Sequence, residues 1–166
     1  MMWVNIIAGL ILFLSFIGGI TGGAVKNLFS LIALLIAIPL AGISYHLLAD
    51  LLSFIPGEDW ENFISFFIIL ALISVILHFV FLLPGKSLQK AWKKGVLFRL
   101  VGGILKIFNT AIGLVVFTLV LQAYPISGWL EWAVTGSGVL NWLVVHLSFV
   151  QAMLPELFRQ VAPPMV

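Results

Sequence analysis

The chain has 166 residues, of which 63% are apolar and 8% are charged, and its sequence contains no cysteine. Soluble domains have about 45–50% apolar and about 25% charged residues, so this chain has too few charges to cover a water-exposed surface. The same composition excludes a disordered chain, and the lack of cysteine excludes a disulfide scaffold and a thiolate metal site. Of the classes of protein considered, these exclusions leave an integral membrane protein of one domain.

Charged residues divide the chain into five uncharged stretches, 1–25, 27–49, 62–85, 107–130 and 132–155. Each stretch is longer than the roughly 20 residues that a helix needs to cross the hydrocarbon core of a membrane. Backbone polar groups in lipid must be satisfied within their own segment, so such stretches form helices.

The first four stretches predict an all-α membrane fold with four transmembrane helices in two hairpins. The predicted spans cover about residues 3–21, 28–48, 62–83 and 104–124.

The fifth stretch is more polar than the others. It opens on Thr135-Gly136-Ser137-Gly138, which indicates a turn followed by a helix N-terminus. The residues from Val139 to Leu154 would form about 24 Å of helix, which is short for a full crossing. We therefore expect an amphipathic, interfacial C-terminal helix over about residues 138–158, with a fifth membrane span as the alternative.

The connections between the spans carry opposite charges. Residues 50–61 have a net charge of −4, and residues 86–106 have a net charge of +6. Cytoplasmic connections collect Lys and Arg, so we predict that the basic connection is cytoplasmic and that both termini are extracytoplasmic. Four lysines of the basic connection share one helical face and are predicted to contact anionic lipid: Lys86, Lys90, Lys93 and Lys94.

Glycines gather at the predicted ends of two spans. Gly18 pairs with Gly22 and Gly19 with Gly23, and glycines spaced by four residues let membrane helices approach closely. Glycine also permits a positive φ, so the run can turn the chain. A Gly-Gly-x-x-Lys sequence occurs at residues 22–26 and again at residues 102–106. Helix packing or a turn is predicted at six glycines: Gly18, Gly19, Gly22, Gly23, Gly102 and Gly103.

Pro39 lies inside the second predicted span. Proline removes one backbone hydrogen bond from a helix and clashes with the preceding turn. We therefore predict a kink at this position.

The sequence contains no recognisable catalytic, cofactor or metal motif. A phosphate-binding P-loop is missing, and the three histidines, His46, His78 and His146, are not spaced as metal ligands. Ser137 lacks the G-x-S-x-G context of a serine nucleophile. We expect a protein that is not an enzyme, needs no cofactor and does not bind nucleic acid.

Two stretches resemble the colicin V production protein (CvpA) family of small bacterial inner-membrane proteins. The first is residues 19–31, with two glycines four apart, then Lys26-Asn27 and Ser30-Leu31; the second is Phe98-Arg99-Leu100-Val101-Gly102. A further similarity lies in Trp132, Ser137 and Leu154-Pro155. The family pattern has an acidic residue where this chain has Asn27, and an Asp where it has Phe98.

The resemblance implies a multi-pass protein of the bacterial inner membrane with a role in toxin export or envelope homeostasis. We expect a non-enzymatic accessory protein that works through contacts, with the lipid bilayer and with other membrane proteins or further copies of itself. The alternative is a subunit of a small transporter or channel. The predicted partner surface comprises five residues of the C-terminal helix and the loop before it: Trp129, Trp132, Leu140, Leu143 and Leu147.

Overall fold

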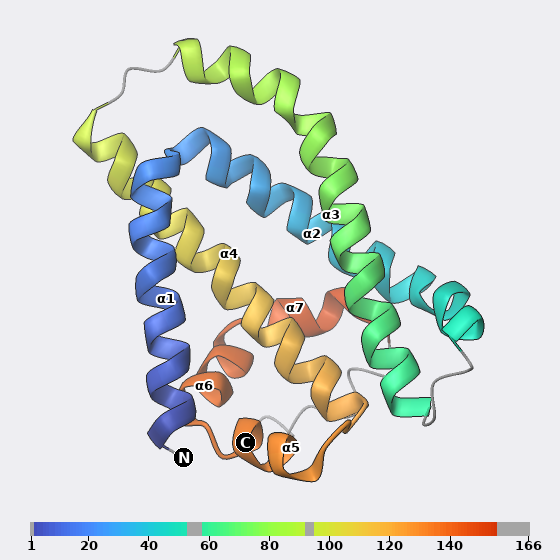
Figure 1. The fold of residues 1–166 in the computed structure, drawn as a ribbon. Coiled ribbons are helices and arrows are strands. Elements are labelled where there is room, and N and C mark those ends of the chain that lie inside the picture. The colour runs from blue at the N-terminus through green and yellow to red at the C-terminus, as the bar shows by residue number, and fades with distance from the viewer. Residues whose placement is uncertain (1, 53–57, 92–94, 156–166) are drawn as a thin grey trace.

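The computed structural model describes residues 2–52, 58–91 and 95–155, with the backbone alone described for residue 58 and residues 82–91. These residues form helices joined by short connections, without a strand among them (Figure 1). The elements are α1 (Met2–Gly22), α2 (Ala24–Ala49), the 3₁₀ turn η1 (Asp50–Leu52), α3 (Glu58–Ala91), α4 (Val96–Ala123), α5 (Gly128–Thr135), α6 (Gly138–His146) and α7 (Ser148–Met153). The predicted all-α class is confirmed.

Four helices, α1 to α4, are long and apolar enough to cross a membrane. Each predicted span falls on one of them. Helix α3 continues to Ala91 and α4 begins at Val96, well beyond the predicted spans at 62–83 and 104–124. Helices can continue past the hydrocarbon because water satisfies their outer turns, so hydropathy locates a span better than it locates the helix ends.

The closest packing in the bundle joins helices of different hairpins. Helix α1 lies along α4, while α2 packs on both α3 and α4, and α1 and α2 share few contacts. A set of fully buried side chains from α2, α3 and α4 fills the centre: Ile38, Tyr45, Phe66, Ile112 and Leu119. The hydroxyls of Tyr45 and Tyr124 share a hydrogen bond of 2.7 Å that ties α2 to the end of α4.

Charge distinguishes the two ends of the bundle. The α1–α2 turn and the start of α4 carry Lys26 and Arg99, and we call this the basic end. The other end holds the start of α1, the start of α3 and helix α5, with Asp59, Glu61 and Glu131, and we call it the acidic end. In Figure 1 the basic end is at the top and the acidic end is at the bottom.

The C-terminal segment is divided where a single helix over 138–158 is predicted, and residues 156–158 of that prediction lie outside the described residues. Helix α6 ends at His146, Leu147 leaves the helical conformation with ψ near 36°, and α7 follows to Met153. Pro155 sets the end of α7, because the residue before a proline avoids the α region and Leu154 is extended. Helices of nine and six residues are too short to cross a membrane, so the alternative of a fifth span is not supported.

The break lets both halves of the segment bury apolar side chains against the bundle. Helix α6 packs on α1 and α4, and α7 packs on α4 (Figure 1). Val150 and Leu154 are fully buried beyond the break. The last described residue of the segment, Pro155, lies against α2, where a Cβ atom at Gly42 would lie 2.6 Å from Cδ of Pro155. The C-terminal segment is therefore part of the core.

Candidate functional site

Helices α1 and α4 cross at glycine. A Cβ atom at Gly19 would lie 2.5 Å from the carbonyl oxygen of Gly102 and 2.7 Å from Cα of Gly103. A Cβ atom at Gly102 would in turn lie 2.7 Å from the carbonyl oxygen of Gly19. A side chain at either position does not fit at such distances, so the backbones of α1 and α4 are in direct contact here. The predicted glycines Gly19, Gly102 and Gly103 thus lie where the two backbones approach most closely, and their packing role stays a prediction.

Gly23 makes the turn between α1 and α2. Its φ is 76°, which L-residues other than glycine rarely adopt, and it is the one position with a positive φ in the described residues. The other two predicted glycines have looser surroundings. A Cβ atom at Gly18 would meet nothing within 4 Å, and at Gly22 it would make an ordinary contact of 3.5 Å with the Asn27 side chain.

The side chain of Asn27 forms hydrogen bonds across the place where α1 and α4 cross. Its Nδ2 atom lies 3.0 Å from the Gly19 carbonyl oxygen, 3.0 Å from that of Gly23 and 2.9 Å from that of Gly102. Asn27 is buried, so its amide donates in a place that water does not reach. One side chain thus links the end of α1, the turn and α4. From the sequence, Asn27 is recognisable only as a departure from an acidic family pattern, and its role at the crossing was not predicted.

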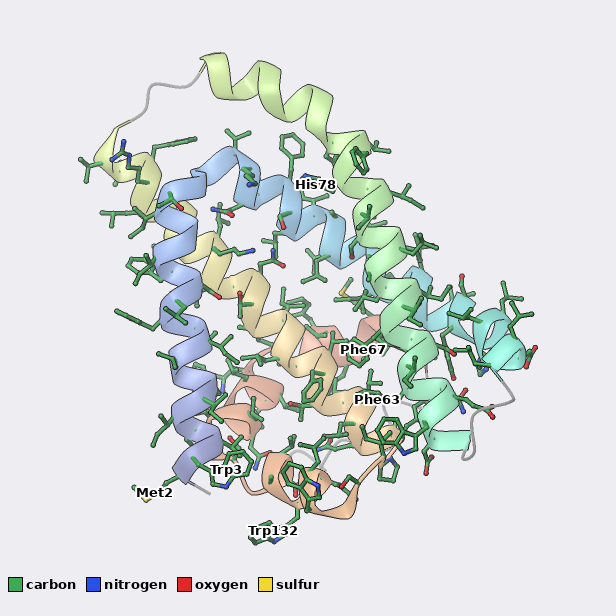
Figure 2. The ribbon with its side chains drawn as sticks, viewed as in Figure 1. Met2, Trp3, Phe63, Phe67, His78 and Trp132 are labelled. Carbon is green, nitrogen blue, oxygen red and sulfur yellow. The ribbon has the colours of Figure 1, made fainter. Side chains whose placement is uncertain are left out.

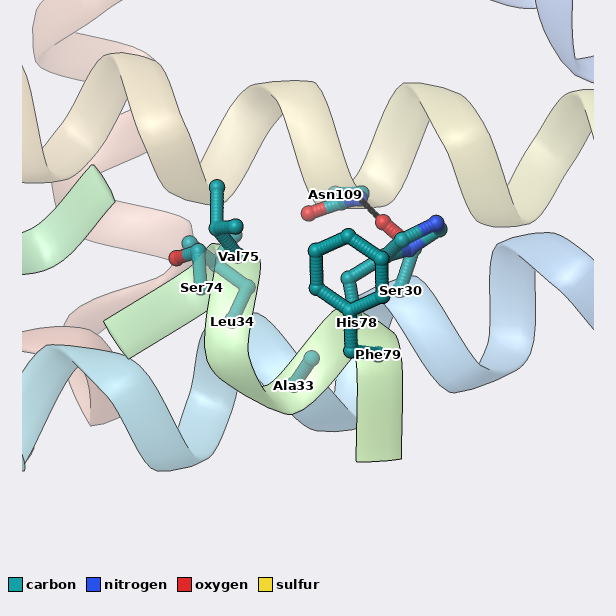
Figure 3. A pocket seen from close by; sticks show the side chains of 8 residues that line it. All are labelled: Ser30, Ala33, Leu34, Ser74, Val75, His78, Phe79 and Asn109. Atoms are coloured by element: carbon teal, nitrogen blue, oxygen red, sulfur yellow. Dashed lines mark hydrogen bonds between the residues drawn. The ribbon is translucent and has the colours of Figure 1, made fainter. Parts of the chain in front are cut away.

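A cavity of about 480 Å³ lies between α2, α3 and α4, towards the basic end (Figure 3). It is lined from α2 by Ser30, Ala33 and Leu34, and from α4 by Asn109. Its α3 side is made by Ser74, Val75, His78 and Phe79. Asn109 donates a hydrogen bond of 2.9 Å from Nδ2 to Oγ of Ser30. Polar side chains from three membrane helices therefore meet at one cavity.

The predicted kink and the predicted lipid contact remain untested by the structure. Pro39 lies inside α2, which continues through it from Ala24 to Ala49, and the kink stays a prediction. Lys86 and Lys90 belong to α3, but their side chains lie outside the described residues. Lys93 and Lys94 lie outside the described residues altogether. The predicted lipid contact of these four lysines stays a prediction.

The predicted partner surface divides into buried and exposed parts. Leu140, Leu143 and Leu147 are buried in the chain's own core, so they are not available to a partner. The prediction that these three leucines form a partner surface is therefore wrong. The apolar stripe that they form is buried against α1 and α4 instead. Trp129 and Trp132 remain exposed, at 64% and 68%.

Three tryptophans form a surface at the acidic end. The rings of Trp3 and Trp129 lie 6.4 Å apart, and Trp3 and Trp132 lie at the same end of the molecule (Figure 2). Trp3 also borders an apolar pocket of about 150 Å³ lined by residues of α1, α4, α5 and α6. We call Trp3, Trp129 and Trp132 the tryptophan surface.

Asn5 anchors the segment next to this surface. Its Oδ1 atom accepts a hydrogen bond from Oγ of Ser137 at 2.7 Å and another from the backbone N–H of Val139 at 3.2 Å. Oγ of Ser137 accepts from the N–H of Leu140 and so caps α6, as the sequence predicts. The start of α1 thereby holds the start of α6.

The family profile described as Colicin V production protein matches residues 4–148 of this chain. No curated protein and no solved structure gives a significant match. The profile covers α1 to α6 almost completely, including the glycine crossing, the Asn27 side chain, the cavity and two of the three tryptophans of the tryptophan surface, Trp129 and Trp132. The chain is a multi-pass membrane protein and belongs to the colicin V production protein family.

Proposed function

We propose that this chain is a non-enzymatic accessory protein of the bacterial inner membrane that supports toxin export or envelope homeostasis by contacting other membrane proteins. Family membership supports the link to colicin V production. The tryptophan surface is the observation that carries the contact role. Large aromatic side chains beside an apolar pocket are the usual centre of a protein interface.

Two local features support a role without catalysis. Ser137 has its hydroxyl engaged with Asn5 and Leu140. The nearest histidine in the sequence, His146, places Nδ1 2.9 Å from the carbonyl oxygen of Trp142 and stacks on that indole.

Removing the two α5 tryptophans of the tryptophan surface should abolish function without unfolding the protein. We expect a Trp129→Ala/Trp132→Ala double variant to reach the membrane in normal amounts and to fail to complement a deletion strain in toxin release and detergent resistance. Both side chains are exposed, so their loss costs little packing inside the chain.

The matched control for this experiment is Ile43→Ala/Leu47→Ala. These two side chains are each 73% exposed on α2, and their truncation also removes apolar surface. The control should complement fully. Full complementation by the tryptophan double variant would contradict the contact role, and loss in both variants would point to membrane anchoring in general, since tryptophan also favours the membrane–water interface.

The orientation belongs to the same proposal. The −4 charge of residues 50–61 and the +6 charge of residues 86–106 support a cytoplasmic location for the basic end. Because the chain has no cysteine, single cysteines can report on each side. An impermeant thiol reagent added to cells with a permeabilised outer membrane should label Ser127→Cys and leave Ser87→Cys unlabelled. The reverse pattern would overturn the orientation.

The transporter or channel subunit remains the second candidate, and the cavity at Ser30 and Asn109 favours it. Towards the acidic end, however, fully buried Ile38, Tyr45 and Leu119 fill the space between the same helices. A polar path through the membrane would therefore need a second copy or another subunit. Solute flux in liposomes that contain the purified chain alone would favour this candidate over the accessory role.

A further inference from the structure

The cavity between α2, α3 and α4 has a lining of mixed character. Ser30, Ser74, His78 and Asn109 contribute hydroxyl, imidazole and amide groups, while Ala33, Leu34, Val75 and Phe79 are apolar. The polar groups carry no full negative charge and include hydrogen-bond donors. Ser30 and Asn109 are hydrogen-bonded to each other. Polar side chains inside membrane spans are costly and often functional, so a group of them beside a cavity is a candidate binding site.

The cavity is open towards the lipid. Phe79 and Val75 are 67% and 53% exposed, and His78 is exposed as well. In a membrane-spanning region these side chains face the acyl chains of the bilayer. Helix α3 packs on α2, whereas it meets α4 through the rings of Phe63, Phe67 and Phe117 towards the acidic end. The two backbones stay apart, so beside the cavity the opening lies between α3 and α4. A ligand can enter sideways from the membrane and does not need a path from water.

Positive charge lies one helical turn from the polar lining. Lys26 precedes Ser30 by four residues on α2, and Lys106 precedes Asn109 by three residues on α4. Both lysines are nearer to the basic end than the cavity is. An anionic group of a bound molecule would lie there, with its less polar part among the side chains of Figure 3.

We propose that this cavity binds one anionic phospholipid from the leaflet at the basic end. The glycerol ester region lies against Ser30, Ser74, His78 and Asn109, and an acyl chain lies along Leu34, Val75 and Phe79. The phosphate lies towards Lys26 and Lys106. Basic pockets between membrane helices bind anionic headgroups in this way.

Phospholipid matches three properties of the cavity together. Its volume of about 480 Å³ is in the range of about 300–1,000 Å³ typical of ligand sites. Its lateral opening lets a lipid enter directly from the membrane. Along α2 the order Leu34, Ser30, Lys26, from apolar to neutral polar to basic, matches the order of groups along a phospholipid. The inference does not depend on the accessory role or on any partner at the acidic end.

Filling the cavity tests the proposal. The purified chain is exchanged into detergent after incubation with phosphatidylglycerol, and bound lipid is counted by native mass spectrometry. We expect the wild-type chain to retain one phosphatidylglycerol, and Ser74→Phe to lower the bound fraction at least five-fold. Ile76→Phe is the matched control, because Ile76 is 53% exposed on α3 and does not line the cavity; it should retain lipid as the wild type does.

Three results would overturn the proposal: equal retention by Ser74→Phe and wild type, no retention by the wild type, or equal retention of phosphatidylcholine and phosphatidylglycerol.

A second measurement does not need a variant. Phosphatidylglycerol with a photoreactive acyl chain, in vesicles with the wild-type chain, should crosslink mainly to residues 74–79 and 104–109. Crosslinks spread evenly over the exposed face of α1, which includes Leu10, Phe13 and Ile17, would refute a specific site.

Discussion

Replacing Gly19 with alanine should lower the free energy of unfolding by about 1–3 kcal/mol, the range for overpacking a well-packed site. The added Cβ would lie 2.5 Å from the carbonyl oxygen of Gly102 and 2.6 Å from Cβ of Lys106. Backbone atoms cannot rotate away as a side chain can, so α1 and α4 have to separate. Leucine at this position should prevent the two helices from packing at all. Reversible unfolding of the purified chain in detergent measures the effect.

Gly18 provides the control from the adjacent position. A Cβ atom there would meet nothing within 4 Å, although both glycines lie in α1 and both belong to a pair spaced by four residues. Gly18→Ala should be neutral or slightly stabilising, since alanine favours a helix more than glycine does. Equal destabilisation by the two substitutions would show that the helices do not cross at Gly19.

Replacing Asn27 with leucine should destabilise the protein by about 2 kcal/mol. Hydrogen bonds between membrane helices contribute about 0.6 kcal/mol each on average and up to about 1.7. The Asn27 amide lies within bonding distance of three carbonyl oxygens from α1, the turn and α4, and leucine can bond to none of them. The same unfolding measurement in detergent tests this expectation.

Thr21→Val is the control for Asn27. Thr21 also bonds to a glycine carbonyl, that of Gly18, but the bond is exposed and lies within α1. Its loss should change the free energy of unfolding by less than about 0.5 kcal/mol. If Asn27→Leu is as mild as Thr21→Val, Asn27 does not hold the crossing together.

Sequence reasoning located the spans because hydrophobicity and charge act over whole segments. It also marked the glycine run, but Gly18 with Gly22 and Gly19 with Gly23 have the same spacing, and only the rotation of α1 shows which pair meets α4. The Asn27 bonds could not be predicted, because Gly19, Gly23 and Gly102 come together only after folding. The available signal was an uncharged amide side chain in the first turn after a glycine run.

The C-terminal segment shows a second limit to what can be predicted from the sequence. An amphipathic stripe indicates that Leu140, Leu143 and Leu147 need burial, but the stripe is the same for a partner's helix, a lipid surface or the chain's own bundle. The structure selects the bundle. The cavity was missed for a related reason, since Ser30, Ser74, His78 and Asn109 come from three helices and share no sequence motif.

Photocrosslinking in living cells tests most directly whether the chain works through the tryptophan surface. A photoreactive amino acid is placed at Trp132 or, as a control, at Ile43, which is exposed on α2. The contact account predicts a discrete adduct with a membrane protein, or with a second copy of the chain, at position 132 and none at position 43. The adduct should disappear when Trp129 is also changed to alanine, together with complementation. A chain that complements fully while position 132 forms no protein adduct would contradict the account.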